Sequence, residues 1–308
     1  MLRRSLFRTA IAIALASLPF TTPSAQELRG SGPWPTAVTE RPLTLDEGMV
    51  ELWLPVNMNL TDGRELEPYN LNPSIYFGLT DSWMIGVRHF VGICPADEAD
   101  GCPEAYDDVS LDTVFAFGRG TGLNLGVGGA INYAPIHDDP AWSAEVRLIA
   151  RAGGGALAIT AAPTLNFGLN DRDAGTDLLP DEIPATKWTG TPLNLGTYNV
   201  LTPAVSPGNR EYLLIPVTLQ LQLGERIAVA AGASLNGPIN AEDLDFSDVY
   251  TIPVSVGLVL ALFPSVDLGA ALTFPNLAGA DFEEEGVGFQ LANGTDERQL
   301  SVFATLRL

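Results

Sequence analysis

The sequence predicts an all-β protein, a transmembrane antiparallel up-and-down β-barrel of about 12 strands. Three observations predict it: apolar residues recur at every second position in short segments, tiny and long connections alternate, and acidic residues gather in the long connections. Hydrophobic residues make up 46% of the chain. Yet after the N-terminal leader no segment offers the roughly 20 uninterrupted apolar residues of a membrane helix. Membrane-spanning strands are therefore favoured over helices.

Residues 1–25 have the order of a secretory signal peptide. Three arginines precede an apolar run over 10–20 and a small, polar stretch over 21–25. We expect cleavage after Ala25, with the triplet at 14–16 as the alternative, and hence an exported chain. Loss of the three arginines would take the formal net charge from -21 to -24. Nucleic acid is a poor partner for so acidic a surface.

The segment 26–47 contains Pro33, Pro35 and Pro42 and has no convincing period. It is predicted to be a periplasmic N-terminal arm. Such an arm could tuck into the barrel mouth or stay mobile, and the sequence leaves both possibilities open. The transmembrane barrel itself is predicted to span 48–308.

Twelve segments alternate between apolar residues and mostly small or polar ones. The clearest runs over 213–223, where large aliphatic residues occupy every odd position. A helix would scramble the two faces, whereas a strand separates them. Most segments supply the ~9 to 11 residues that a tilted membrane strand needs. The predicted strands are 48–60, 72–79, 83–92, 109–118, 121–134, 140–152, 156–169, 213–223, 227–236, 249–262, 266–274 and 300–308.

The lengths of the connections distinguish a membrane barrel from a soluble β-sandwich. After the first link every second link is tiny, and the links between them are mostly longer, the largest at 170–212. Short turns at one rim and long loops at the other are typical of outer-membrane barrels with both termini in the periplasm. A Greek-key sandwich gives no reason for such alternation. The predicted periplasmic turns are 80–82, 119–120, 153–155, 224–226 and 263–265.

Charged and aromatic residues follow the same partition. Of the 37 acidic residues, 27 lie in the six predicted extracellular loops, together with five basic residues. The lipid-facing positions of the strands carry no Asp, Glu, Lys or Arg. Trp83 and Trp142 lie near strand ends, as interface girdles require. Trp53 does not fit this pattern, because its position points it into the lumen.

The inward-facing positions carry four acids and four arginines among amides. One hypothesis is a hydrated pore whose charges select solutes, and the alternative is a salt-bridge network that plugs the interior. The many Gly, Ala, Ser and Thr residues at inward positions favour the pore, with the long loop or the N-terminal arm as its constriction. The predicted pore-lining residues are Glu51, Asn57, Arg88, Asp112, Asn132, Glu145, Arg147, Arg151, Gln220, Asp267 and Arg307.

Cys94 and Cys102 lie close together in a polar stretch of a chain predicted to be exported. The oxidising periplasm favours a single disulfide between them, and no zinc-type spacing is present. We therefore predict a Cys94–Cys102 bond at the outer rim.

The loop segment 171–182 resembles a calcium-binding loop in part. Asp171, Asp173, Asp177 and Glu182 take positions one, three, seven and twelve. The fifth and sixth positions depart from the pattern, and a strand is predicted before the loop where an EF-hand needs a helix. A solvated acidic loop is favoured, so no metal site and no cofactor are predicted.

Some small barrels hydrolyse lipids with His and Ser two residues apart on a lipid-facing strand, and neither histidine of this chain has that arrangement. His89 is followed at that spacing by Val91, and His137 lies in a loop beside acidic residues. Since a nucleophile without its base is inert, the chain is predicted not to be an enzyme.

Two local stretches carry a resemblance. Residues 78–87, Gly-Leu-Thr-Asp-Ser-Trp-Met-Ile-Gly-Val, and 41–45, Arg-Pro-Leu-Thr-Leu, resemble parts of uncharacterised Gram-negative outer-membrane barrels, including the phenol-degradation meta-pathway transporter type. This resemblance implies the outer membrane of a Gram-negative bacterium and a transporter or channel role. Its implied partners are outer-membrane lipid, lipopolysaccharide and the barrel assembly machinery.

The leading functional hypothesis is therefore passive or facilitated passage of small solutes through an outer-membrane barrel. The alternative is a non-conducting surface protein whose acidic loops bind divalent cations or a partner. The sequence does not name the solute, because selectivity depends on pore radius and side-chain placement.

Overall fold

The computed structural model describes residues 34–60, 69–89, 92–93, 108–117, 122–136, 139–170, 211–239, 246, 250–275, 277–278 and 298–308. Apart from the short 3-10 helix η2 (Val38–Glu40), the regular structure in this part of the chain is strand. The strands are β1 (Val50–Asn59), β2 (Tyr69–Leu71), β3 (Ser74–Thr80), β4 (Trp83–Arg88), β5 (Val109–Ala116), β6 (Gly122–Ile136), β7 (Asp139–Gly154), β8 (Leu157–Ala161), β9 (Thr164–Gly168), β10 (Tyr212–Gln222), β11 (Ile227–Pro238), β12 (Val254–Phe263), β13 (Val266–Phe274) and β14 (Gln299–Arg307).

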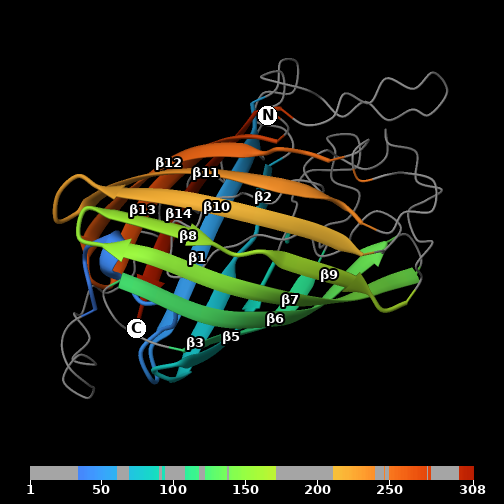
Figure 1. Ribbon diagram of the computed structural model, residues 1–308, viewed down its shortest axis with the longest axis horizontal. Coiled ribbons are helices and arrows are strands. Elements are labelled where there is room, and N and C mark those ends of the chain that lie inside the picture. Colours follow the sequence, from blue (N-terminus) through green and yellow to red (C-terminus); the bar gives the residue numbers. More distant parts are fainter. Residues whose placement is uncertain are drawn as a thin grey trace, which may run out of the picture.

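These 14 strands form twelve barrel-spanning strands, here called staves, because two of the staves are each interrupted near a proline and so consist of two named strands. β2 and β3 both pair with β1, on either side of 72–73, and β8 and β9 both pair with β7 and β10, on either side of 162–163. Proline offers no N–H to the ladder, so the pairing breaks there. β14 pairs with β1, with Glu51 opposite Arg307, and this closes the sheet (Figure 1).

The predicted fold class is confirmed. Each stave pairs antiparallel with the next one in sequence, which is the up-and-down topology of a transmembrane barrel. Two strand boundaries differ from the prediction by four or five residues: the strand expected at 249–262 begins at Val254, just after Pro253, and the strand expected at 83–92 ends at Arg88. Among the described residues, no helix combines the length and the apolar content needed to cross a membrane.

The two rims of the barrel differ as the connections predict. The turn side carries the short connections 81–82, 155–156, 223–226 and 264–265. The ends of the barrel chain meet there too, since the backbones of Val50 and Leu308 exchange two hydrogen bonds of 2.9 Å. The opposite rim, the loop side, carries the longer connections, apart from the two-residue connection 137–138 between β6 and β7, and the largest of these lies outside the described residues.

Along each strand, side chains on the outer face of the barrel alternate with side chains on the inner face, because the side-chain period of a strand is two. On β10, Val217, Leu219 and Leu221 are 42–43% exposed, whereas Thr218 and Gln220 between them are 3% and 1% exposed. Large aliphatic side chains stay on the outside because that face meets hydrocarbon rather than water. At the loop side, the exposed Trp142 packs edge-on against Tyr133, with ring centroids 4.9 Å apart. At the turn side, Trp83 and Phe263 are exposed in the same way.

Candidate functional site

The described part of the N-terminal arm, residues 34–47, lies inside the barrel at the turn side. The chain enters over β3 at Gly78, where any Cβ would collide with the backbone of Asp46. The Gly48 N–H donates to the Gly78 carbonyl at 2.6 Å, and the Gly78 N–H donates to the Met49 carbonyl at 2.9 Å. Only glycine tolerates so close a backbone approach. Of the two possibilities that the sequence left open, the structure places the described part of the arm, residues 34–47, in the barrel mouth.

Apolar side chains anchor the arm against two parts of the inner wall. Trp34, Leu43 and Leu45 are at most 5% exposed and belong to one cluster, and Val38, 1% exposed, belongs to a second. In the first cluster the wall contributes Tyr76, Met84, Val114, Ala116, Ile149 and Ala162. In the second it contributes Trp53, Ala228, Ala230, Val259, Ala271 and Phe303.

This packing corrects one inference from the sequence. Small inward residues favour an open lumen when they are considered alone. On the turn side, however, alanines of β11 and β13 make room for Val38 of the arm. The same cluster explains the inward Trp53, whose ring lies 6.0 Å from that of Phe303. The small residues of this half therefore accommodate the protein's own chain.

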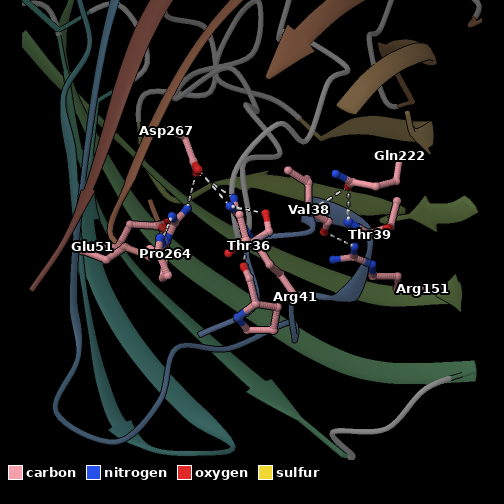
Figure 2. Close-up of polar contacts among 11 residues, drawn as sticks. Thr36, Val38, Thr39, Arg41, Glu51, Arg151, Gln222, Pro264 and Asp267 are labelled. Atoms are coloured by element: carbon pink, nitrogen blue, oxygen red, sulfur yellow. Dashed lines mark hydrogen bonds and ion pairs between the residues drawn. The ribbon is translucent and has the colours of Figure 1, made fainter. Parts of the chain in front are cut away.

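An ionic network also fixes the arm to the wall. Arg41 donates two hydrogen bonds to the Asp267 carboxylate, at 2.7 and 2.8 Å, and Figure 2 shows its guanidinium directed at that carboxylate. Arg307 bridges Asp267 and Glu51, each at 2.7 Å. Burial lowers the pKa of the Arg41 guanidinium and neighbouring Arg307 lowers it further, whereas the Asp267 carboxylate opposes this shift. Because all four groups are buried, each charge depends on its partners.

The 3-10 turn of the arm makes a second set of polar contacts. The Val38 N–H donates to Oε1 of Gln222 at 2.9 Å, and its carbonyl accepts from Nη2 of Arg151 at 2.8 Å (Figure 2). The Thr39 hydroxyl donates to the Gly155 carbonyl at 2.5 Å. Further along, the Thr44 hydroxyl donates to a turn carbonyl at 2.6 Å. The arm is thus hydrogen-bonded to the turns as well as to the strands.

A third polar group lies farther along the wall, on β4, β5 and β7. Arg88 contacts Asp112 at 3.2 Å and Glu145 at 2.7 Å, and Arg147 contacts the same two carboxylates. The hydroxyl of Tyr76 donates to Asp112 at 3.0 Å. These five side chains are at most 4% exposed. The two arginines and the two acids form a closed ring of charges, in which each arginine contacts both carboxylates.

Two glycines make this ring possible. Gly86 lies between Tyr76 and Asp112 across the sheet, and the Tyr76 ring occupies the space of its missing side chain. Gly128 faces Arg147, and a Cβ there would lie 2.9 Å from Nε of that arginine. A glycine on the intervening strand leaves room for a long side chain to reach across it.

The loop-side half of the lumen has a different wall. Apart from the charge ring, its inward positions are mostly small and polar, with Tyr212 and Leu214 as larger residues among them. Neighbouring side chains bond to each other, as at Asn132 and Ser143, 3.0 Å apart, and at Ser255 and Thr273, 2.8 Å apart. The polar side chains of this wall include Asn57, Asn72, Asn132, Ser143, Asn166, Ser234, Asn236, Ser255, Thr273 and Ser301.

Ten of the eleven predicted pore-lining side chains are buried, and Asn57 is half-buried. Seven of them, with Arg41 and Tyr76, belong to the two ionic groups just described. Sequence reasoning missed Arg41 as a member of the site, because it lies in an aperiodic segment. A signal was present: the arm carries Trp34, Leu43 and Leu45, which a fully solvated segment has no reason to carry.

Several predicted features fall outside the described residues. They are the signal peptide, Cys94 and Cys102, the turn at 119–120 and the acidic loop at 171–182. The disulfide and the leader therefore remain predictions. Within the described ranges, no group of three or more His, Cys, Asp or Glu side chains is arranged to hold a metal ion.

Comparison with solved structures finds similar barrels at low sequence identity. The NanC porin aligns with a TM-score of 0.50 and 9% identity, over 83% of this chain and 100% of that chain. The KdgM porin in complex with disordered oligogalacturonate gives 0.49 and 6%, over 83% and 98%. An outer membrane channel from Pseudomonas putida F1 gives 0.45 and 10%, over 86% and 97%. The fold is that of an outer-membrane barrel.

The chain matches no family model and none of the curated proteins.

Proposed function

We propose that this protein is an outer-membrane channel for passive or facilitated passage of small solutes. One observation carries the proposal: on β11, β12 and β13, beyond the arm, the lumen wall continues as small, polar side chains. Ser234, Ser255 and Thr273 replace the large aliphatic residues that would fill a sealed interior. A barrel that served only as a scaffold would gain nothing from such a wall.

Unsatisfied polar atoms on the same wall support the proposal. Within the described chain, Oδ1 of Asn132 and Nδ2 of Asn236 are buried and have no hydrogen-bond partner. Buried amide groups normally find a partner in protein or in water. Groups of this kind are the ones that exchange hydrogen bonds with solvent or solute along a pore.

The arm sets the narrowest part of the proposed path. It occupies the turn side, where the ionic network of Arg41, Asp267 and Arg307 and the two apolar clusters surround it. A solute entering from the loop side would meet the polar half first and this constriction last. Of the two constrictions that the sequence suggests, the arm has direct support.

Reconstitution into planar bilayers tests the proposal. Protein whose migration on SDS gels changes on boiling, as a closed barrel's does, should give reproducible conductance steps. Vesicles without protein are the control. Absence of steps in repeated reconstitutions of heat-modifiable protein would reject the channel.

A second candidate function has its own supporting observation. The closed charge ring of Arg88, Asp112, Glu145 and Arg147 is the salt-bridge network expected of a plugged interior. In that case the protein would be a non-conducting surface protein whose acidic loops bind divalent cations or a partner. Conductance separates the two candidates.

The same proposal includes the cellular setting. We propose export by a cleaved signal peptide at 1–25, insertion by the barrel assembly machinery, and contact with outer-membrane lipid and lipopolysaccharide. The exposed aliphatic belt of the staves supports a lipid environment. A bond between Cys94 and Cys102 is proposed for the outer rim, and quantitative thiol labelling on intact, unreduced cells would refute it.

A further inference from the structure

Arg151 differs from the other arginines of the lumen in its partners. Arg41, Arg88, Arg147 and Arg307 each contact at least one carboxylate. In the described chain Arg151 meets only neutral acceptors, although it is 3% exposed. A buried cation without an anion is costly, and a bound anion would remove that cost.

The surroundings of Arg151 are polar but uncharged. Across the ladder it faces Asn124 on β6 and Thr160 on β8, and Thr218 on β10 faces Thr160 in turn. Gln220 lies beside it on the same stave as Thr218. Hydroxyl and amide groups can all donate to an anion. None of the described ion pairs places a carboxylate on Arg151 itself.

The contacts of Arg151 indicate what kind of anion fits. Its Nη2 already donates to two trigonal oxygens, the Val38 carbonyl at 2.8 Å and Oε1 of Gln220 at 3.2 Å. A carboxylate offers two such oxygens within one planar group and adds a negative charge, and Arg–carboxylate pairs are accordingly bidentate and strong. The arm's carbonyl therefore stands where a carboxylate oxygen would bind.

We propose that Arg151 binds the carboxylate of a small organic acid in place of the Val38 carbonyl, so that solute and arm compete for one guanidinium. The proposal rests on the proposed channel function and names the solute class for the same lumen. It also gives the arm a role in selection: a solute that displaces the η2 turn gains passage at the constriction.

The test compares potassium acetate with potassium chloride at equal ionic strength on the reconstituted full-length protein. We expect conductance to saturate with acetate in the wild type. Arg151→Gln should raise the half-saturating acetate concentration about tenfold, because one charge-assisted contact is lost. The half-saturating acetate concentration of Arg151→Lys should lie between those of the wild type and Arg151→Gln, because lysine keeps the charge and lacks the planar guanidinium. Arg226→Gln, at an exposed turn, is the matched control and should match the wild type.

A second measurement keeps the proposal separate from the channel hypothesis. In detergent, acetate should raise the thermal midpoint of the folded protein above its value in chloride, and Arg151→Gln should abolish that difference while Arg226→Gln keeps it. If no variant conducts but this difference is seen, the site stands and the channel fails. Conductance or stabilisation by acetate that is identical in wild type and Arg151→Gln would overturn the site.

Discussion

Both halves of the lumen carry small side chains on their walls, yet these residues face different things. On the turn side, Ala228, Ala230 and Ala271 seat the arm residue Val38. On the loop side, Ser255 and similar residues bond to one another around the axis. A small inward residue therefore leaves space either for another segment of the chain or for solvent and solute. Polarity distinguishes them, because only the apolar half offers a surface on which a segment gains by burial.

The difference extends to the charges. On the turn side a carboxylate, Asp267, is shared between the wall residue Arg307 and the arm residue Arg41. Farther along, the ring of Arg88, Asp112 and Arg147 is complete within the wall. The first network therefore depends on the arm, and the second does not. This predicts that the two halves respond differently to the same kind of mutation.

Removing the arm should have the largest effect. Replacing 34–47 by a Gly/Ser linker of equal length abolishes the burial of four large apolar side chains, each worth roughly 1.5–3 kcal/mol. The free energy of unfolding should fall by several kcal/mol, and the conductance of the protein that remains folded should rise. Denaturant titration and single-channel recording check the two parts. Unchanged conductance in heat-modifiable protein would show that the arm does not constrict the path.

Asp267→Asn should come next. The change leaves Arg41 and Arg307 buried beside each other without their shared anion, and breaking a buried pair costs about 3–5 kcal/mol. Glu225→Gln, at an exposed turn, is the control and should change the free energy of unfolding by less than about 1 kcal/mol. Equal effects of the two substitutions in denaturant titration would contradict the proposed dependence of this network on burial.

Ser255→Phe examines the loop-side half. If that half is a solvent path, the added ring should reduce single-channel conductance by roughly half while leaving the barrel folded. The adjacent Val256→Phe is a matched control, because Val256 is 50% exposed on the outer face and should leave conductance unchanged. Should Ser255→Phe instead prevent folding and Val256→Phe not, the loop-side half is packed and the plugged alternative gains support.

Neutralising Glu283, Glu284 and Glu285 should have the smallest effect. With 27 acids against five bases, the predicted extracellular loops set a negative potential that concentrates cations. Reversal potentials should favour potassium over chloride at low salt, and the preference should shrink toward molar salt, where the Debye length is about 3 Å. The triple substitution should reduce the preference. This rim effect acts on all ions, whereas Arg151 discriminates among anions, so acetate affinity should stay unchanged.

The sequence by itself determined the local architecture. Alternation over 213–223 specified a strand and its lipid-facing side, and a turn such as 224–226 specified an antiparallel neighbour. Each of these features depends on residues close together in the chain, because the side-chain period of a strand is two and a short turn leaves only a hairpin. The strands and their facing were therefore predictable, whereas the interruptions near Pro73 and Pro163, the start at Val254 and the end at Arg88 were not.

Only the tertiary structure decided what fills the barrel. The ion pair between Arg41 and Asp267 joins residues 226 positions apart, and the contact of Arg151 with Val38 spans 113. No local pattern records such pairings, because they depend on how the closed sheet staggers its strands and on which inner glycines, such as Gly78, let backbone pass. The same set of inward-facing charged residues could line an open pore or could form a network that binds the arm. Closure of the barrel around residues 34–47 selected the second arrangement on the turn side.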